Sequence, residues 1–171
     1  MRRAGRPVGR RRGDALIEFT LIGIPVIFLT ISIVEISLAM WQYHSLAYSV
    51  DIAARYAITH GRGCTQNGNS CSVTLGNVAT VLQNQALALD SGKMNVTFYT
   101  HSTTTSCNPL NTCTSNATTF PNSTDNGVNL DVKIVATYPV ANPFPLLWPG
   151  SSGSSGGLFT LGATSRQRIV F

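Results

Sequence analysis

Acidic residues and histidines are scarce in this 171-residue chain, which has seven Asp and Glu residues and three His. The histidines, His44, His60 and His101, complete no metal-ligand spacing with the cysteines. No paired carboxylates and no nucleophile motif accompany them, so the side chains needed for acid–base or nucleophilic catalysis are missing. We therefore predict that the chain is not an enzyme and that it binds neither a metal nor a cofactor.

Basic residues are equally scarce outside the first thirteen positions. Six of the twelve lie in residues 1–13, and three of these form the run Arg10-Arg11-Arg12 just before an apolar stretch. Without that segment the chain has six basic and seven acidic residues, a net charge of −1. This distribution excludes a basic face for nucleic acid. Arginines before an apolar run instead hold that end of the chain in the cytoplasm, which favours contact with a lipid bilayer.

The chain has four cysteines, but no C-x-x-C spacing. The spacing therefore disfavours zinc and favours disulfides. Of the three possible pairings, we favour the one with the shortest loops, Cys64 with Cys71 and Cys107 with Cys113. All four cysteines follow the apolar stretch. If the amino end is cytoplasmic, they lie in an oxidising compartment.

The apolar stretch predicts a transmembrane helix over residues 14–41. Phe19 to Val34 contains no charged residue. A helix from Gly13 to Glu35 rises about 33 Å, slightly more than the hydrocarbon core of about 30 Å. Trp41 then fits the outer interfacial belt.

Glu18 is the costly residue of this stretch, because it lies about 7–8 Å inside the bilayer if Gly13 marks the boundary. A carboxylate at mid-membrane costs roughly 2.5–3.5 kcal/mol, so Glu18 needs a partner. Glu35 falls near the other boundary, where headgroups and water can reach it. Pro25 removes a backbone donor and should bend the helix. Gly23 permits another backbone to approach closely.

The helix signal continues past the membrane, over residues 42–60. No proline or glycine interrupts it before Gly61, and Asp51 and Arg55 are spaced for an i,i+4 ion pair. Apolar residues recur at steps of three and four: Leu46, Val50, Ala53, Ala54 and Ala57. We therefore expect one helix from about Asp14 to Thr59.

Residues 61–171 predict a small extracytoplasmic domain, so the fold class is α+β with a three-stranded antiparallel sheet. The expected elements are a short helix over 75–89 and strands over 95–101, 128–138 and 158–171. Ser72 is the expected cap of the short helix and Gly92 its stop. Arg166 and Arg168 share one face of the last strand and are expected to point to solvent.

The head of the chain resembles a known family. Behind the basic leader, Gly13-Asp14-Ala15-Leu16-Ile17-Glu18-Phe19 matches the processing pattern of type IV prepilins. The longer stretch Glu18-Phe19-Thr20-Leu21-Ile22-Gly23-Ile24-Pro25, with Glu35 and Asp51-Ile52-Ala53-Ala54-Arg55-Tyr56-Ala57, resembles the TadE-like pseudopilins of tight-adherence (Tad/Flp) pilus systems. The resemblance is strong over residues 10–60, weak from Asn129 to Phe171, and absent over 64–125. The family usually has an aromatic residue and glycine after Glu35, where this chain has Ile36-Ser37.

The resemblance implies a minor pilin or pseudopilin whose leader, residues 1–13, is removed by a prepilin peptidase. Gly13 lacks a Cβ and leaves the scissile backbone unhindered. Cleavage creates an ammonium group at Asp14, which the resemblance implies is met by Glu18 of a neighbouring subunit. The implied assembly residues are Glu18, Phe19, Pro25 and Glu35. The implied partners are other pilin and pseudopilin subunits, the peptidase, the Tad secretion machinery and the bilayer. The implied location is a single pass through the bacterial cytoplasmic membrane, with the amino end in the cytoplasm.

A second interpretation is a secreted, disulfide-linked protein with an ordinary signal peptide cleaved near Ala39. Ser37-Leu38-Ala39 has the small-x-small pattern of such sites. The length of the apolar run and the helix signal that continues past Ala39 weigh against it. In this interpretation the mature chain begins at Met40 and is soluble.

Overall fold

The computed structural model describes residues 12–60, 65–66, 69–70, 73–141 and 157–169, with side chains over 16–60, 73–140 and 160–169. The chain forms two compact units, Met1–Leu38 and Ala39–Phe171. In its described part the first unit is helical, whereas the second combines helices with sheets.

Helix α1 runs from Arg12 to Thr59 and confirms the single long helix expected from the sequence. Its part within the first unit contains Pro25 and four Ser and Thr residues. Their hydroxyl groups donate to carbonyl oxygens of the same helix three or four residues earlier, as Thr20 does to Leu16 at 3.1 Å. Back-bonding of this kind satisfies a hydroxyl group without water, as an apolar solvent requires.

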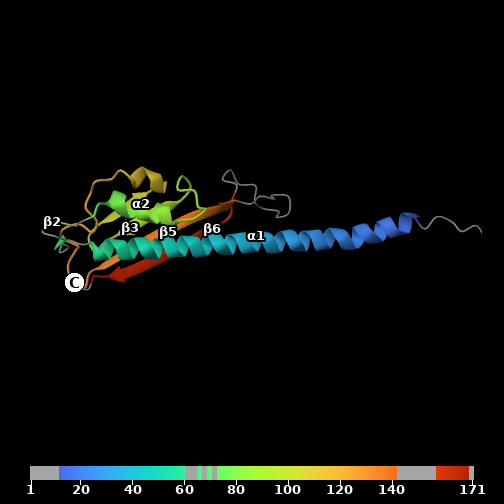
Figure 1. Cartoon of the computed structure of the whole chain (residues 1–171), viewed down its shortest axis with the longest axis horizontal. Helices are drawn as coiled ribbons and strands as arrows, with labels where there is room; N and C mark the ends of the chain where they lie inside the picture. Colours follow the sequence, from blue (N-terminus) through green and yellow to red (C-terminus); the bar gives the residue numbers. More distant parts are fainter. Residues whose placement is uncertain (1–11, 61–64, 67–68, 71–72, 142–156, 170–171) are drawn as a thin grey trace, which may run out of the picture. The chain divides into compact units, whose positions relative to one another are not determined.

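The second unit contains a four-stranded antiparallel sheet in the order β4-β3-β5-β6, which confirms the α+β class (Figure 1). Its strands are β3 (Asn95–Tyr99), β4 (Thr104–Cys107), β5 (Asp131–Ala141) and β6 (Gly157–Arg168). A separate two-stranded ladder joins β1 (Thr65–Gln66) to β2 (Asn69–Ser70).

The prediction of three strands is wrong by one, because β4 lies in what looked like a loop. Its sequence, Thr104-Thr105-Ser106-Cys107, buries only the last residue. A polar edge strand shows no apolar alternation, so its sequence does not reveal it. Its backbone pairs with β3 from Val96 to Tyr99.

The bounds of β5 also differ from the expected 128–138. A turn precedes the strand: the N–H of Leu130 donates to the Gly127 oxygen at 3.1 Å, and Asn129 has a positive φ of 70°. Val128 is therefore outside the sheet and 59% exposed. At its other end β5 continues through Pro139, which lies beyond the last pair with β3. Proline is tolerated where one side of a strand has no ladder to complete.

Helix α2 (Leu75–Gln85) is shorter than the expected 75–89. Its cap is Thr74, whose Oγ1 accepts from the Asn77 N–H at 3.2 Å. The expected cap, Ser72, lies outside the described residues. The helix ends at Ala86, before Gly92, and Ala88 follows with a φ of 60° that takes the chain out of helical geometry.

The start of α2 packs closely against the loop rich in Ser, Thr and Asn. The N–H groups of Leu75 and Gly76 donate to the oxygens of Thr118 and Asn116 at 2.7 and 2.9 Å. Free N–H groups at a helix start need such partners. A Cβ at Gly76 would lie 2.6 Å from the Thr114 oxygen, so only glycine allows this approach.

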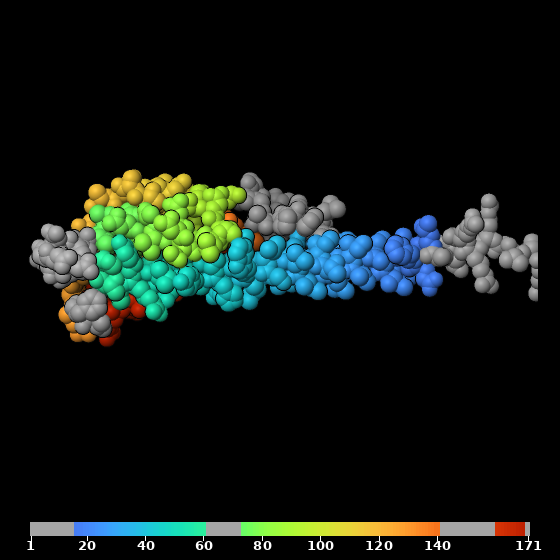
Figure 2. All heavy atoms as spheres, in the orientation of Figure 1, coloured from blue at the N-terminus to red at the C-terminus, as the bar shows by residue number. Residues whose placement is uncertain are grey.

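The core lies between one face of the sheet and two helices, α2 and the second part of α1. Figure 2 shows these helices side by side. The apolar stripe expected on α1 is fully buried, at 0% exposure for each member: Leu46, Val50, Ala53, Ala54 and Ala57. Alternate residues of β5, from Val132 to Val140, are buried in the same core.

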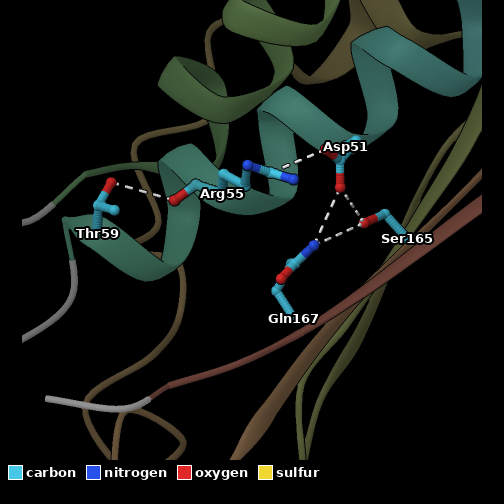
Figure 3. A network of polar contacts seen from close by, with 5 residues as sticks. All are labelled: Asp51, Arg55, Thr59, Ser165 and Gln167. Carbon is cyan, nitrogen blue, oxygen red and sulfur yellow. Dashed lines mark hydrogen bonds and ion pairs between the residues drawn. The ribbon is translucent and has the colours of Figure 1, made fainter.

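Asp51 ties α1 to the edge strand β6 (Figure 3). Its Oδ1 accepts from Ser165 Oγ at 3.1 Å and from Gln167 Nε2 at 3.0 Å. Its Oδ2 lies 2.8 Å from Arg55 Nε, which confirms the expected i,i+4 ion pair. Because the Arg55 side chain is 65% exposed, the two hydrogen bonds to β6 should stabilise the fold more than the ion pair.

We expect Asp51→Ala to lower the free energy of unfolding by about 1–3 kcal/mol, because it leaves Ser165 and Gln167 without their charged acceptor. Arg55→Ala should cost less than about 1 kcal/mol. Thermal unfolding of the full chain in detergent, followed by circular dichroism, measures both. Equal losses in the two variants would show that the ion pair, and not the link to β6, carries the effect.

Candidate functional site

The residues expected at the cleavage site lie in the first turns of α1. Gly13 and Asp14 belong to the helix, although their side chains lie outside the described ones. Glu18 is exposed, and so is Phe19, at 75%. Asp14 and Glu18 are one helical turn apart and therefore share a face of α1.

The helix that follows exposes apolar side chains on every side. They are Leu16, Ile17, Phe19, Leu21, Ile22, Ile24, Val26, Ile27, Phe28, Leu29, Ile33, Val34, Ile36 and Leu38. In water such a surface is costly, whereas hydrocarbon accepts it. By length and composition, this helix is able to cross a membrane.

Gly23 and Pro25 interrupt this apolar surface. A Cβ at Gly23 would meet only ring atoms of Phe19, at 3.7 Å or more, within the described residues. The helix is thus open for close approach at Gly23. Pro25 lies inside α1 and lacks the N–H that the helical ladder requires.

The two acidic side chains of this helix differ in exposure. Glu18 is exposed, whereas Glu35 is half-buried and its Oε1 makes no hydrogen bond within the described part of the chain. The sequence led us to expect Glu35 near the outer membrane boundary and Glu18 as the carboxylate that needs a partner. Glu18 is the carboxylate that stands open to another molecule.

The cysteines were expected to form two short-loop disulfides. Cys107 at the end of β4 is bonded to Cys113 at the end of the 3₁₀ helix η1 (Leu110–Cys113), as predicted. Both cysteines and Leu110 between them are buried. Cys64 and Cys71 lie outside the described residues. The described residues contain no group of three possible metal ligands.

Asp125 holds the polar loop to the β3–β4 turn, a role that the sequence did not reveal. Only 2% of this residue is exposed. Its Oδ2 accepts from Thr100 Oγ1, from Ser102 Oγ at 2.7 Å and from the Ser102 N–H at 3.0 Å. Burial alone raises the pKa of Asp125, but these hydrogen bonds and the charge of His101 outweigh it, so the pKa lies below its usual value.

The sheet face opposite the core carries a shallow cleft that sequence reasoning also missed. Strand register places Tyr99, Lys133 and Arg166 in one row across β3, β5 and β6. These side chains line a cavity of about 440 Å³, together with His101 and Asn129. The alternation of residues along β5 and β6 indicates that their charged residues lie on the outer face. Only the strand register shows that these residues are neighbours.

We expect the Asp125 contacts to weaken in acid. Because its pKa is lower in the folded chain, its stabilisation is complete above about pH 4, the unfolded value, and is lost as the pH falls through the folded pKa. The melting temperature, measured from neutral pH down to the acid range, should fall more steeply for the natural chain than for Asp125→Asn. Asp90→Asn, in another loop, is the matched control. Parallel acid profiles for Asp125→Asn and the natural chain would contradict this role.

Residues 13–55 match the family described as TadE-like protein. The match begins at Gly13 and includes Glu18, Pro25, Glu35 and Asp51. Searches of curated proteins and of solved structures found no match. The matched segment lies within α1 and contains the motif residues on which the resemblance depends, and it supports a component related to Tad pili. Over residues 13–55 this chain is therefore similar to the TadE-like proteins.

Proposed function

We propose that this protein is a non-catalytic structural component of a Tad pilus, a minor pilin or pseudopilin that acts in pilus biogenesis and adherence. The observation that carries the proposal is the TadE-like segment, which begins at the Gly13–Asp14 bond and continues along a helix with an exposed apolar surface. Its partners are other pilin and pseudopilin subunits and the Tad secretion machinery.

The first part of α1 is the membrane anchor in this proposal. Its apolar side chains are exposed all round, and its hydroxyl groups are satisfied by the helix itself. The arginines before it keep the amino end in the cytoplasm. The second unit is then extracytoplasmic, where the Cys107–Cys113 disulfide is stable.

A prepilin peptidase cuts the chain between Gly13 and Asp14. The new ammonium group of Asp14 pairs with Glu18 of a neighbouring subunit. The exposure of Glu18 supports contact between subunits, because no part of its own described chain covers it. In the apolar bilayer, loss of one partner of such a pair costs about 3–5 kcal/mol. The pair therefore favours one register of neighbouring helices over others.

Cleavage is tested by mass spectrometry of the membrane-extracted protein from cells that contain the peptidase. The expected first residue is Asp14. Gly13→Val should leave the chain uncut, because a branched side chain blocks the scissile bond, whereas Gly9→Val makes the same change within the leader and should be cut normally.

Two outcomes contradict the cleavage proposal. An intact amino terminus in the natural chain shows that no leader is removed. A soluble product beginning at Met40 establishes the secreted protein with an ordinary signal peptide.

Assembly is tested by comparing Glu18→Ala with Glu35→Ala. Glu18→Ala should impair pilus assembly and surface adherence more strongly, because only Glu18 meets the new ammonium group. Glu18→Gln, which keeps the shape but not the charge, should behave like Glu18→Ala. Pili are counted by electron microscopy at matched protein levels.

Cleavage of each variant is checked in the same samples, so that an assembly defect is separated from a processing defect. Equal loss in the Glu18 and Glu35 variants, or normal assembly of Glu18→Gln, would remove Glu18 from the proposed role.

A further inference from the structure

The outer face of the sheet in the second unit carries an unassigned cleft of about 440 Å³. It is far along the chain from the residues proposed for anchoring and assembly. Its volume lies in the range of small-ligand sites, about 300–1,000 Å³, and suits a single ring better than an extended chain. Tyr99, Lys133 and Arg166 form its floor, one from each of three adjacent strands.

Positive charge dominates this cleft. Arg166 and Arg168 both donate to Asp131, through different carboxylate oxygens. Lys133 lies with its Nζ 5.1 Å from the centroid of the Tyr99 ring and makes no ion pair within the described residues. The lining of the cleft thus contains two cations, Lys133 and Arg166, and one carboxylate, Asp131, which is a local excess of one positive charge, and Arg168 adds a second beside it. The chain outside its leader has a net charge of −1, so this excess is a local feature.

Asp131 remains ionised under ordinary conditions and keeps the two arginines in place. The hydrogen bond from Arg166 is the main cause of the lowered pKa of Asp131. The hydrogen bond from Arg168 and the positive charges of both arginines lower this pKa further, whereas burial raises it by less than the Arg166 hydrogen bond lowers it. Arg166 and Arg168 are still 68% and 62% exposed, so their remaining N–H groups are free to donate outward.

The sheet face beside the cleft is mainly polar, although Leu130 lines the cleft itself and Val135 lies on the same face. The neighbouring residues of the same face include Thr97, Ser106, Thr137 and Thr164. A face rich in hydroxyl groups offers hydrogen bonds but little apolar area for the dry centre of a protein interface. His101 and Asn129 at the rim are exposed and add further polar groups. Hydroxyl-rich ligands with an acidic group match this combination.

We propose that this cleft binds a uronic acid unit of an acidic polysaccharide, with Lys133 and Arg166 holding the sugar carboxylate and Asn129 and His101 contacting its hydroxyl groups. Charge complementarity selects an acidic sugar over a neutral one, because a carboxylate accepts charge-assisted hydrogen bonds from both cations. This ligand role goes beyond assembly of the pilus.

The test is isothermal titration calorimetry of the full chain in detergent with tetragalacturonate, and with its methyl ester as the neutral analogue. We expect the acid to bind and the ester to bind at least about tenfold more weakly, since the ester lacks the charged acceptor. Lys133→Gln should weaken binding of the acid by a similar factor. Lys133→Arg should retain it. Lys93→Gln removes the same charge from an exposed loop residue outside the cleft and is the matched control.

Three results would overturn the proposal: equal binding of the acid and its ester, unchanged binding by Lys133→Gln, or an equal loss in Lys93→Gln. Inorganic phosphate that displaces the sugar at equal concentration would assign the cleft to phosphate groups and would also overturn it. Cleavage after Gly13 is measured on the same variants. It is expected to be normal in each, so a failure of sugar binding is distinct from a failure of the assembly role.

Discussion

The folded unit depends on burial of one stripe of α1. Strands β3, β5 and β6 present an apolar face that needs a cover, and Leu46, Val50 and the alanines of α1 provide it together with α2. Burial of one Leu or Val side chain contributes about 1.5–3 kcal/mol. The small side chains of Ala53, Ala54 and Ala57 let the helix backbone lie close to its neighbours. The core of the second unit therefore includes part of the helix that also continues into the exposed apolar stretch.

One helix thus meets two sets of requirements, and its sequence changes accordingly. Between Leu16 and Leu38 apolar side chains occupy all sides, as hydrocarbon permits. Between Leu46 and Ala57 the buried apolar side chains form one stripe, and charged residues such as Asp51 and Arg55 lie beside it. The helix is continuous, so only the change from apolar residues on all sides to a single apolar stripe separates its two parts. A single helix without a stop signal therefore contains both patterns.

These patterns explain how much of the fold was predictable. A long helix and the apolar alternation of β3 and β5 follow from periodicity, because burial on one face imposes it. β4 was missed because three of its four residues are polar, and its place depends on backbone pairing with β3. The turn before β5 depends on the positive φ of Asn129, and the cap at Thr74 on a hydrogen bond to Asn77. Several nearby Ser, Thr and Asn residues could form such a cap or turn. The sequence therefore does not show which of them does so.

The candidate functional residues also differ in how far the sequence predicts them. Gly13, Glu18, Pro25 and Glu35 lie in one continuous stretch that extends to the segment 51–57, so their spacing in the sequence carries the TadE-like resemblance. The cleft residues come from three strands and meet only through register, which no spacing reveals.

The two groups of charges also differ in what they can do, because a charge pair has different consequences in lipid and in water. In the proposed membrane anchor, an unpaired Glu18 is costly, so the proposed pairing at that position favours one arrangement of subunits. On the exposed sheet face, the pairs of Asp131 with Arg166 and Arg168 are screened by solvent and contribute little to stability. Weak ion pairs rearrange easily. These arginines can therefore bind the carboxylate of a ligand in place of Asp131 or together with it. We therefore propose that the apolar helix provides specific assembly and that the exposed sheet face provides reversible recognition.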